Sequence, residues 1–129
     1  MTALALLMKR TLALAALLGA HALQAAEPLI AVAAEGPEAQ AAVSGVAARA
    51  PRILLFDARG TLLAAHVNPA AGKSGGAGPA LARWLAERQV TLLIAGDVGA
   101  KLAPELQRLK IRRVKASGPA EQAVKAVTK

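Results

Sequence analysis

Short apolar runs alternate with turn-forming residues through most of the chain and predict five β-strands. Each run has the length of a strand and ends at Gly, Pro, Asp or Asn, the residues that turns favour. The turn Ala58-Arg59-Gly60 is short enough to join two of the runs as a hairpin. The expected strands are residues 29–34 (LIAVAA), 53–57 (ILLFD), 61–67 (TLLAAHV), 91–95 (TLLIA) and 111–115 (IRRVK).

Helical periodicity appears in three segments of the second half of the chain. Pro79 is expected to open the first helix, because proline favours the first helical position. Apolar residues recur three and four positions apart in each segment, as they do on the buried side of a helix. The three stripes are Leu81, Trp84 and Leu85; Leu102, Leu106 and Leu109; and Ala123, Val124 and Val127. Residues 38–50 are expected to be a loop with at most one helical turn.

The order of these elements predicts an α/β fold. A strand and a hairpin come first, and helices and strands then alternate, which is typical of parallel strands joined by right-handed crossovers. A chain of 129 residues accommodates one domain. We therefore expect a single-domain mixed five-stranded sheet with an N-terminal antiparallel hairpin and flanking helices.

The first 26 residues have the pattern of a secretory signal peptide. Lys9 and Arg10 precede the apolar run 11–19, and small residues follow up to Ala26. A retained membrane anchor is the alternative, but the apolar stretch is shorter than the roughly 20 residues that a spanning helix needs. We predict cleavage after Ala25 or Ala26, with Ala22 as a further possibility.

This interpretation divides the chain into a signal peptide, 1–26, and a binding domain, 27–129. Met8 is an alternative start to Met1 because the charged segment begins there. The mature protein is expected in the periplasm or outside the cell, and it would meet a membrane only during export.

The charge of the chain favours anionic partners. Without Lys9 and Arg10, the 16 basic residues fall to 14 against 8 acidic ones, so the remaining domain carries +6. Such a surface attracts anions, although solubility alone also explains it. The basic run 108–115 could indicate nucleic acid, but only 2% of the residues are aromatic. Proteins bind single-stranded nucleic acid largely by stacking its bases on aromatic rings, so we expect no nucleic-acid partner. The basic run is better explained as charged residues that protect an edge strand from pairing.

The chain contains few residues of the types that usually carry catalysis or bind metals. The chain has no cysteine, which excludes disulfides and cysteine-ligated metal sites. His66 is the single histidine outside the leader, so no catalytic triad or protein-ligated metal site is expected. Asp57 is expected to stabilise the hairpin turn, and Asp97 to cap the second helix. The sequence therefore favours a binding protein over an enzyme.

Three loops should converge at the carboxyl ends of the parallel strands, where ligands bind in open α/β sheets. They are residues 35–49, the glycine-rich segment 68–78, and 96–99. Two of them lead into helix N-termini, which favour anions, and glycine lets a backbone approach a ligand closely. A flexible connector is the other interpretation of the glycine-rich segment. A nucleotide P-loop is excluded because Val67 stands where that motif needs glycine. The candidate ligand-binding residues are Ser44, Arg49, Asn68, Lys73, Ser74, Gly75, Gly76, Gly78, Gly96 and Gly99.

Motifs in the same loops resemble the dinitrogenase iron–molybdenum cofactor family, the NifX/NafY-like cofactor carriers. The resemblance covers about residues 29–128. The motifs are Ile30-Ala31-Val32-Ala33, Val43-Ser44, Arg49-Ala50-Pro51, Asn68-Pro69, Gly75-Gly76-Ala77-Gly78 and Ile94-Ala95-Gly96-Asp97-Val98-Gly99. The resemblance implies a ribonuclease H-like fold and non-catalytic binding of a metal–sulfur cluster.

One motif departs from the family pattern. Members often have Ser-Pro-His-Phe-Gly-Arg-Ala after the first strand, whereas this chain has Ser-Gly-Val-Ala-Ala-Arg-Ala at residues 44–50. Val46 therefore stands at the position of the candidate cluster-binding histidine. Taken together, the signal-peptide pattern, the glycine-rich loops and the resemblance predict an exported carrier of a small anionic ligand, either a molybdenum or iron–sulfur cluster or a molybdenum oxo- or thio-anion. The alternative is an interaction module for a periplasmic protein that kept the fold and lost the cluster.

Overall fold

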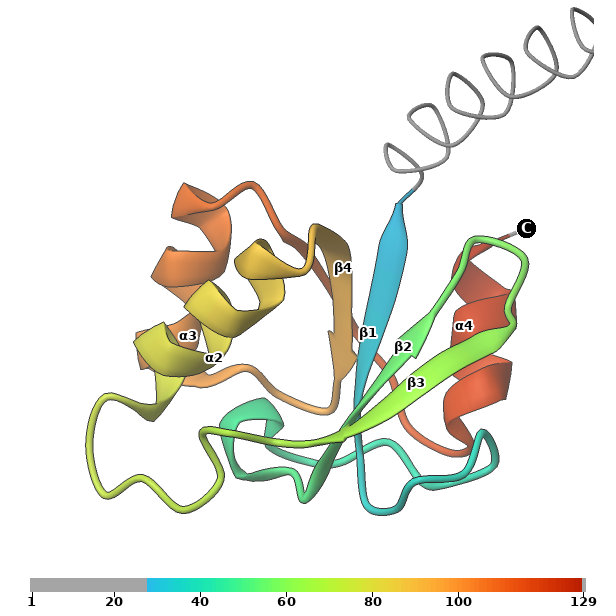
Figure 1. Cartoon of the computed structure of the whole chain (residues 1–129), viewed down its shortest axis with the longest axis horizontal. Coiled ribbons are helices and arrows are strands. Elements are labelled where there is room, and N and C mark those ends of the chain that lie inside the picture. Colours follow the sequence, from blue (N-terminus) through green and yellow to red (C-terminus); the bar gives the residue numbers. More distant parts are fainter. Residues whose placement is uncertain (1–27, 129) are drawn as a thin grey trace, which may run out of the picture.

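A five-stranded sheet in the order β3-β2-β1-β4-β5 runs through the middle of the molecule, with helices on both of its faces (Figure 1). The computed structural model describes residues 28–128. The strands are β1 (Leu29–Ala34), β2 (Arg52–Phe56), β3 (Leu62–Val67), β4 (Val90–Ala95) and β5 (Arg112–Lys115). The helices are the 3-10 helix η1 (Ala47–Arg49) and the α-helices α2 (Ala77–Glu87), α3 (Gly99–Arg108) and α4 (Ala120–Val127).

The strand directions place four loops at one edge of the sheet. β1 is parallel to β4, and β4 is parallel to β5. β2 is antiparallel to both of its neighbours, β1 and β3. The carboxyl ends of β1, β3, β4 and β5 consequently meet at the same edge. The predicted mixed five-stranded sheet and its hairpin are confirmed.

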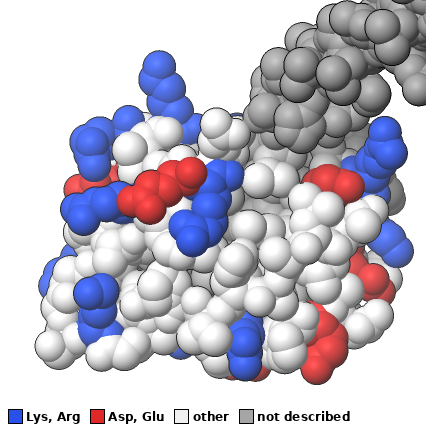
Figure 2. Space-filling view, viewed as in Figure 1, with Lys and Arg blue, Asp and Glu red and all other residues white. Residues whose placement is uncertain are grey.

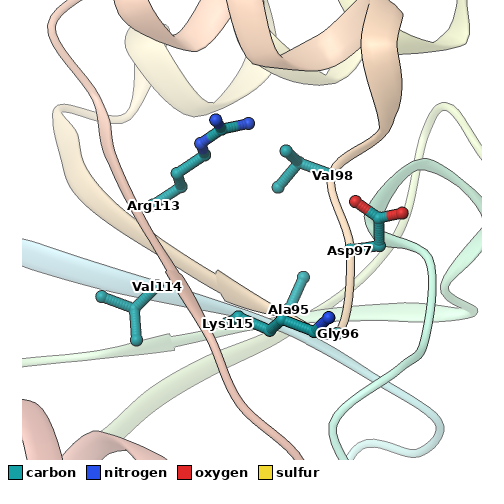
Figure 3. A pocket seen from close by; sticks show the side chains of 7 residues that line it. All are labelled: Ala95, Gly96, Asp97, Val98, Arg113, Val114 and Lys115. Atoms are coloured by element: carbon teal, nitrogen blue, oxygen red, sulfur yellow. The ribbon is translucent and has the colours of Figure 1, made fainter.

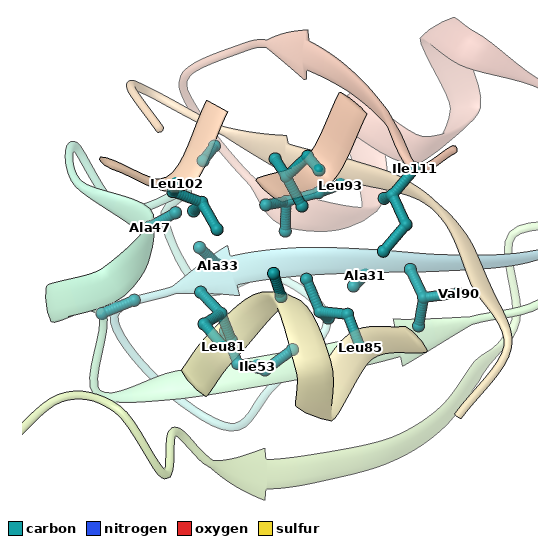
Figure 4. Close-up of a cluster of buried hydrophobic side chains, with 14 of the residues drawn as sticks. Ala31, Ala33, Ala47, Ile53, Leu81, Leu85, Val90, Leu93, Leu102 and Ile111 are labelled. Carbon is teal, nitrogen blue, oxygen red and sulfur yellow. The ribbon is translucent and has the colours of Figure 1, made fainter. Parts of the chain in front are cut away.

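The sheet is buried on both faces because its central strands are apolar throughout. On one face, α2 and α3 cover a core that contains Leu81, Leu85 and Leu102 (Figure 4). Ala31 and Ala33 of β1 lie beneath these helices, and their small side chains let the helices approach the sheet. α4 covers the opposite face, where Phe56 is fully buried.

Two predicted helix boundaries are wrong. α2 begins at Ala77 and not at Pro79, because Gly76 adopts a left-handed conformation (φ +72°) as its N-cap and Ala80 N–H donates to Gly76 O at 3.1 Å. Pro79 falls within the first turn, where a missing N–H costs no helical hydrogen bond. The sequence pattern predicts the second helix over residues 101–109, whereas α3 starts at Gly99.

Both aspartates that follow strands make backbone contacts. The Asp57 carboxylate accepts hydrogen bonds from Arg59 N and Thr61 N, each at 2.9 Å, which confirms its role in the hairpin turn. Asp97 is not the cap residue of α3, since that position belongs to Val98. Its carboxylate nevertheless accepts a hydrogen bond from Gly99 N at 3.1 Å.

The predicted signal peptide, residues 1–26, lies outside the described residues. Within 28–128, none of the helices has the length and apolar character needed to cross a bilayer.

Candidate functional site

The carboxyl edge of the sheet contains two pockets that share Val98. The first, of about 250 Å³, lies between the N-terminal turns of α2 and α3 and is called the helix pocket below. The second, of about 370 Å³, lies at the ends of β4 and β5 and is called the strand pocket (Figure 3). The three loops predicted to converge at this edge contribute residues to one or both pockets.

The helix pocket brings together most of the residues that the sequence indicated as ligand-binding. Those that line it are Arg49, Ser74, Gly75, Gly76, Gly78 and Gly99. Val46, Lys101 and Leu102 line it as well, although the sequence did not single out the last two as site residues. Lys101 could have been found from its place in the first turn of a helix that follows a candidate loop.

Two helix N-termini open into this pocket. The first N–H groups of an α-helix have no partner within the helix, and the helix dipole adds positive potential there. Neither α2 nor α3 has an acidic residue in its first turn, although the Asp97 carboxylate just before α3 accepts the N–H of Gly99. Arg49 and Lys101 supply two cationic side chains, and the pocket lining includes no carboxylate. The helix pocket is therefore electrostatically suited to an anion.

Arg49 also fixes the glycine-rich segment in place. Its Nη1 donates to Lys73 O at 2.9 Å and to Ala71 O at 3.4 Å, so the guanidinium connects η1 to the segment that precedes α2. Lys73 itself is exposed and is not among the residues that line either pocket. Arg49 thus holds one wall of the helix pocket and is itself among the residues that line it.

Asn68 lies behind the pocket and not in its lining. It is 3% exposed, and its Nδ2 donates to Ala47 O at 3.1 Å and to Ala50 O at 2.9 Å. Its Oδ1 accepts a hydrogen bond from Ala70 N at 2.9 Å. These contacts join the loop after β3 to η1, and they explain why a polar side chain is buried at this position.

Ser44 and Gly96 connect the loops after β1 and β4. Ser44 is 4% exposed, and its backbone O accepts a hydrogen bond from Gly96 N at 2.8 Å. A Cβ atom on Gly96 would lie 2.8 Å from the Cα atom of Gly45. Glycine is needed at 96 because the two backbones touch there. Ser44 lines neither pocket, whereas Gly96 lines the strand pocket.

The strand pocket contains charges that the sequence did not connect with a site. The parallel register places Arg113 beside Leu93 and Lys115 beside Ala95, so both basic side chains share the face that α3 covers. Hydrogen bonds from Gly99 N–H and Val98 N–H hold the pKa of the Asp97 carboxyl below its usual range. Lys115 and Arg113 lower that pKa further, and the lining of the pocket thus includes one carboxylate and two cationic side chains.

Protein ligands for a bare metal ion do not cluster in the described part of the chain. Among residues 28–128, no group of three or more His, Cys, Asp or Glu side chains could hold a metal ion. The His66 ring packs edge-on against Trp84, with ring centroids 5.1 Å apart, on the α2 side of the sheet.

The sequence profile of the dinitrogenase iron–molybdenum cofactor family matches residues 28–129, which include the strands, helices and both pockets. The chain belongs to the dinitrogenase iron–molybdenum cofactor family. This result confirms the resemblance seen in the motifs of the loops. A comparison with curated proteins gives no significant match.

Two solved structures extend the family comparison. The apo form of the orange protein from Desulfovibrio gigas is 30% identical, with a TM-score of 0.71 over 78% of this chain and 87% of that chain. A candidate NifB protein from Thermotoga, of the DUF35 family, is 24% identical, with a TM-score of 0.67 over 78% of this chain and 87% of that chain. The second likeness concerns the fold alone.

The family pattern also draws attention to Val46. It stands where the resemblance places a candidate cluster-binding histidine, and here it is 47% exposed and lines the helix pocket. The position therefore lines the pocket in this chain, but it carries an apolar side chain.

Proposed function

We propose that this protein is a non-catalytic carrier of an anionic metal species, held in the helix pocket. The observation that carries the proposal is the convergence of two helix N-termini, Arg49 and Lys101 on one pocket without a carboxylate in its lining. An anion is stabilised by such a combination of backbone amides and cations. Membership of the dinitrogenase iron–molybdenum cofactor family supports a molybdenum or iron–sulfur species as that anion.

The lining favours a species that carries its own sulfur or oxygen ligands. Ser74 contributes a hydroxyl group, and the glycine-rich segment contributes backbone close to the pocket. Val46, Val98 and Leu102 contribute apolar surface, which suits large polarisable sulfido groups better than compact hydrated anions. With no cysteine in the chain, binding would depend on hydrogen bonds, charge and contact area.

The second candidate function is a protein interaction module that kept the fold and lost the ligand. Val46 in the place of the family histidine is the observation that favours it. A stable periplasmic partner that binds Arg49→Ala and Lys73→Ala variants as well as the wild type would support this function over the first.

Calorimetric titration with tetrathiomolybdate, molybdate and phosphate tests the carrier proposal. We expect tetrathiomolybdate to bind tightest, because it alone combines negative charge with sulfido groups. Arg49→Ala should weaken this binding by roughly tenfold or more, as expected for loss of a hydrogen bond to a charged group. Arg59→Ala, in the exposed hairpin turn, is the matched control and should bind as the wild type does. No heat with any of the three anions would contradict the proposal.

Gly75 provides a second, steric test of the same pocket. A Cβ atom there would meet nothing within 4 Å, and the backbone is not in the left-handed region. Gly75→Val should therefore keep the fold, as circular dichroism would show, while its side chain obstructs the pocket and reduces anion binding. Gly76 is unsuited to this test because its φ of +72° would strain any side chain. Unchanged binding by Gly75→Val would remove the glycine-rich segment from the site.

We also propose that the protein is exported and acts in the periplasm or outside the cell. The support is the sequence pattern of residues 1–26. Mass spectrometry of the mature protein should find its N-terminus between Leu23 and Glu27. A cytosolic protein that keeps Met1 or Met8 would contradict export and would make a cytoplasmic carrier the better description.

A further inference from the structure

Three charged side chains line the strand pocket without forming ion pairs with one another. Arg113 and Lys115 extend from β5 on the face that α3 covers, and Asp97 follows β4 (Figure 3). Among residues 28–128, the one ion pair joins Arg108 to Glu105. In the described part of the chain, none of the three pocket charges therefore has an oppositely charged partner in direct contact.

The arrangement differs from that of the charges over α2 and α3. On the face seen in Figure 2, basic and acidic side chains lie next to one another over these two helices. In the strand pocket, Lys115 and Arg113 both lower the pKa of the Asp97 carboxyl, so the three charges are near one another although they form no ion pair. They surround a space of about 370 Å³ that a small ligand can enter.

The backbone holds these charged positions in place. The backbone O of Asp97 accepts a hydrogen bond from Ala47 N at 2.9 Å, and its carboxylate accepts one from Gly99 N at 3.1 Å. Directly after β5, Ala116 N donates to Ala95 O at 3.0 Å, which keeps this strand aligned with β4. A site with a fixed backbone loses less conformational freedom when a ligand binds.

The pocket offers two kinds of binding group. A carboxylate has about four acceptor sites, and the N–H groups of Val98 and Gly99 leave the Asp97 carboxylate able to accept more hydrogen bonds. Arg113 carries a planar fork of donors that fits a carboxylate, and Lys115 carries a compact ammonium group. The lining therefore combines two sites for anionic groups with one site for a cationic group.

We propose that the strand pocket binds a free acidic amino acid, of the class of L-glutamate and L-aspartate. Such a ligand has two carboxylates and one ammonium group, which complement the two cations and one carboxylate of the lining. Arg113 and Lys115 hold the two carboxylates, and Asp97 accepts the ammonium group. Ala95 and Val98 provide apolar surface for the carbon chain, and the pocket volume is in the range of small-molecule sites.

The charges of the lining select this class over other anions. A dicarboxylate without an amino group leaves Asp97 unpaired and brings a like charge near it, and sulfate or phosphate does the same. An acidic residue inside a peptide has lost the charges of its α-amino and α-carboxyl groups. The free amino acid keeps all three charges and satisfies all three side chains.

The proposal is independent of the carrier function. The helix pocket and the strand pocket share Val98 alone, and the cations of the helix pocket are Arg49 and Lys101. The two proposals are tested with different probes and different variants, so the failure of one leaves the other unaffected.

An NMR titration that follows the backbone amides of the purified protein tests the site. All three charged side chains are exposed, so we expect a dissociation constant for L-glutamate on the order of 1 mM. The amide signals of residues 95–98 and 113–115 should shift. Glutarate, which lacks the ammonium group, and L-glutamine, which lacks one carboxylate, should each bind roughly threefold more weakly or worse.

Three variants assign the contacts. Arg113→Ala should weaken L-glutamate binding by roughly threefold or more. Arg112→Ala is the matched control, because it removes the same charge one residue away, at a position that pairs with Leu92 on the α4 face and does not line the strand pocket. It should bind as the wild type does. Asp97→Asn keeps the side-chain shape and should remove the preference for L-glutamate over glutarate.

Unchanged signals of residues 95–98 and 113–115 at saturating L-glutamate would overturn the proposal. Equal binding of L-glutamate and glutarate by the wild type would also overturn it, because Asp97 would then take no part. Equal losses in Arg112→Ala and Arg113→Ala would reduce the effect to general attraction by a basic surface. Circular dichroism checks that the variants fold. Arg113→Lys, which keeps the charge and loses the fork, repeats the test should Arg113→Ala fail to fold, and it should also bind more weakly than the wild type.

Discussion

Replacing Asn68 with alanine is expected to lower the free energy of unfolding by about 3 kcal/mol. The change removes the donor to Ala47 O and Ala50 O and the acceptor for Ala70 N. Each buried polar group left without a partner costs roughly 1–3 kcal/mol. For a domain of this size, the loss corresponds to a decrease in melting temperature of roughly 10–20 °C. Urea denaturation of the two proteins measures the difference.

Asn68→Asp shows whether the loss of stability in Asn68→Ala comes from lost hydrogen bonds or from lost side-chain volume. The carboxylate keeps an acceptor for Ala70 N but turns an oxygen towards the carbonyls of Ala47 and Ala50. We expect it to be at least as destabilising at neutral pH as alanine, despite its near-identical shape. Gln107→Ala, which removes an exposed amide from α3, should change stability little. Wild-type stability of Asn68→Ala would show that the buried network contributes nothing.

Gly96→Ala is expected to destabilise the protein by about 2–3 kcal/mol through crowding alone. The added Cβ atom would lie 2.8 Å from Gly45 Cα and 3.0 Å from both Gly45 O and Ser44 O. All three are backbone atoms, so the loop after β1 would have to move and the 2.8 Å hydrogen bond from Gly96 N to Ser44 O would lengthen. Thermal unfolding followed by circular dichroism measures the effect.

Gly75→Ala is the control for this substitution. It adds the same methyl group at a position where nothing lies within 4 Å. Its effect on stability should fall within about 0.5 kcal/mol. Equal melting temperatures for Gly96→Ala and Gly75→Ala would contradict the close backbone contact between the loops after β1 and β4.

The fold was predictable because its strands are short apolar runs with clear ends. Residues 29–34 and 91–95 are apolar enough to identify central strands buried on both faces, and the alternation of helices and strands indicated the parallel half of the sheet. The start of α2 was not predictable, because the preference of Pro79 for the first helical position is only local. The left-handed backbone of Gly76 sets the boundary instead.

The candidate site was only partly predictable, because side-chain partners far apart in sequence decide which residues face the pocket. Asn68 bonds to carbonyls 18 and 21 residues away, and these contacts place it behind the pocket lining. The charges of the strand pocket depend on the register between β4 and β5, which periodicity does not specify. The helix pocket was found because glycine-rich segments before helices carry a local signal.

Elemental analysis of the protein purified from its native host tests the carrier function most directly. We expect molybdenum or iron in stoichiometric amount with the chain, together with sulfide, and a strong decrease of that metal in Arg49→Ala prepared in the same way. Protein free of both metals after purification from cells supplied with molybdenum and iron would contradict it.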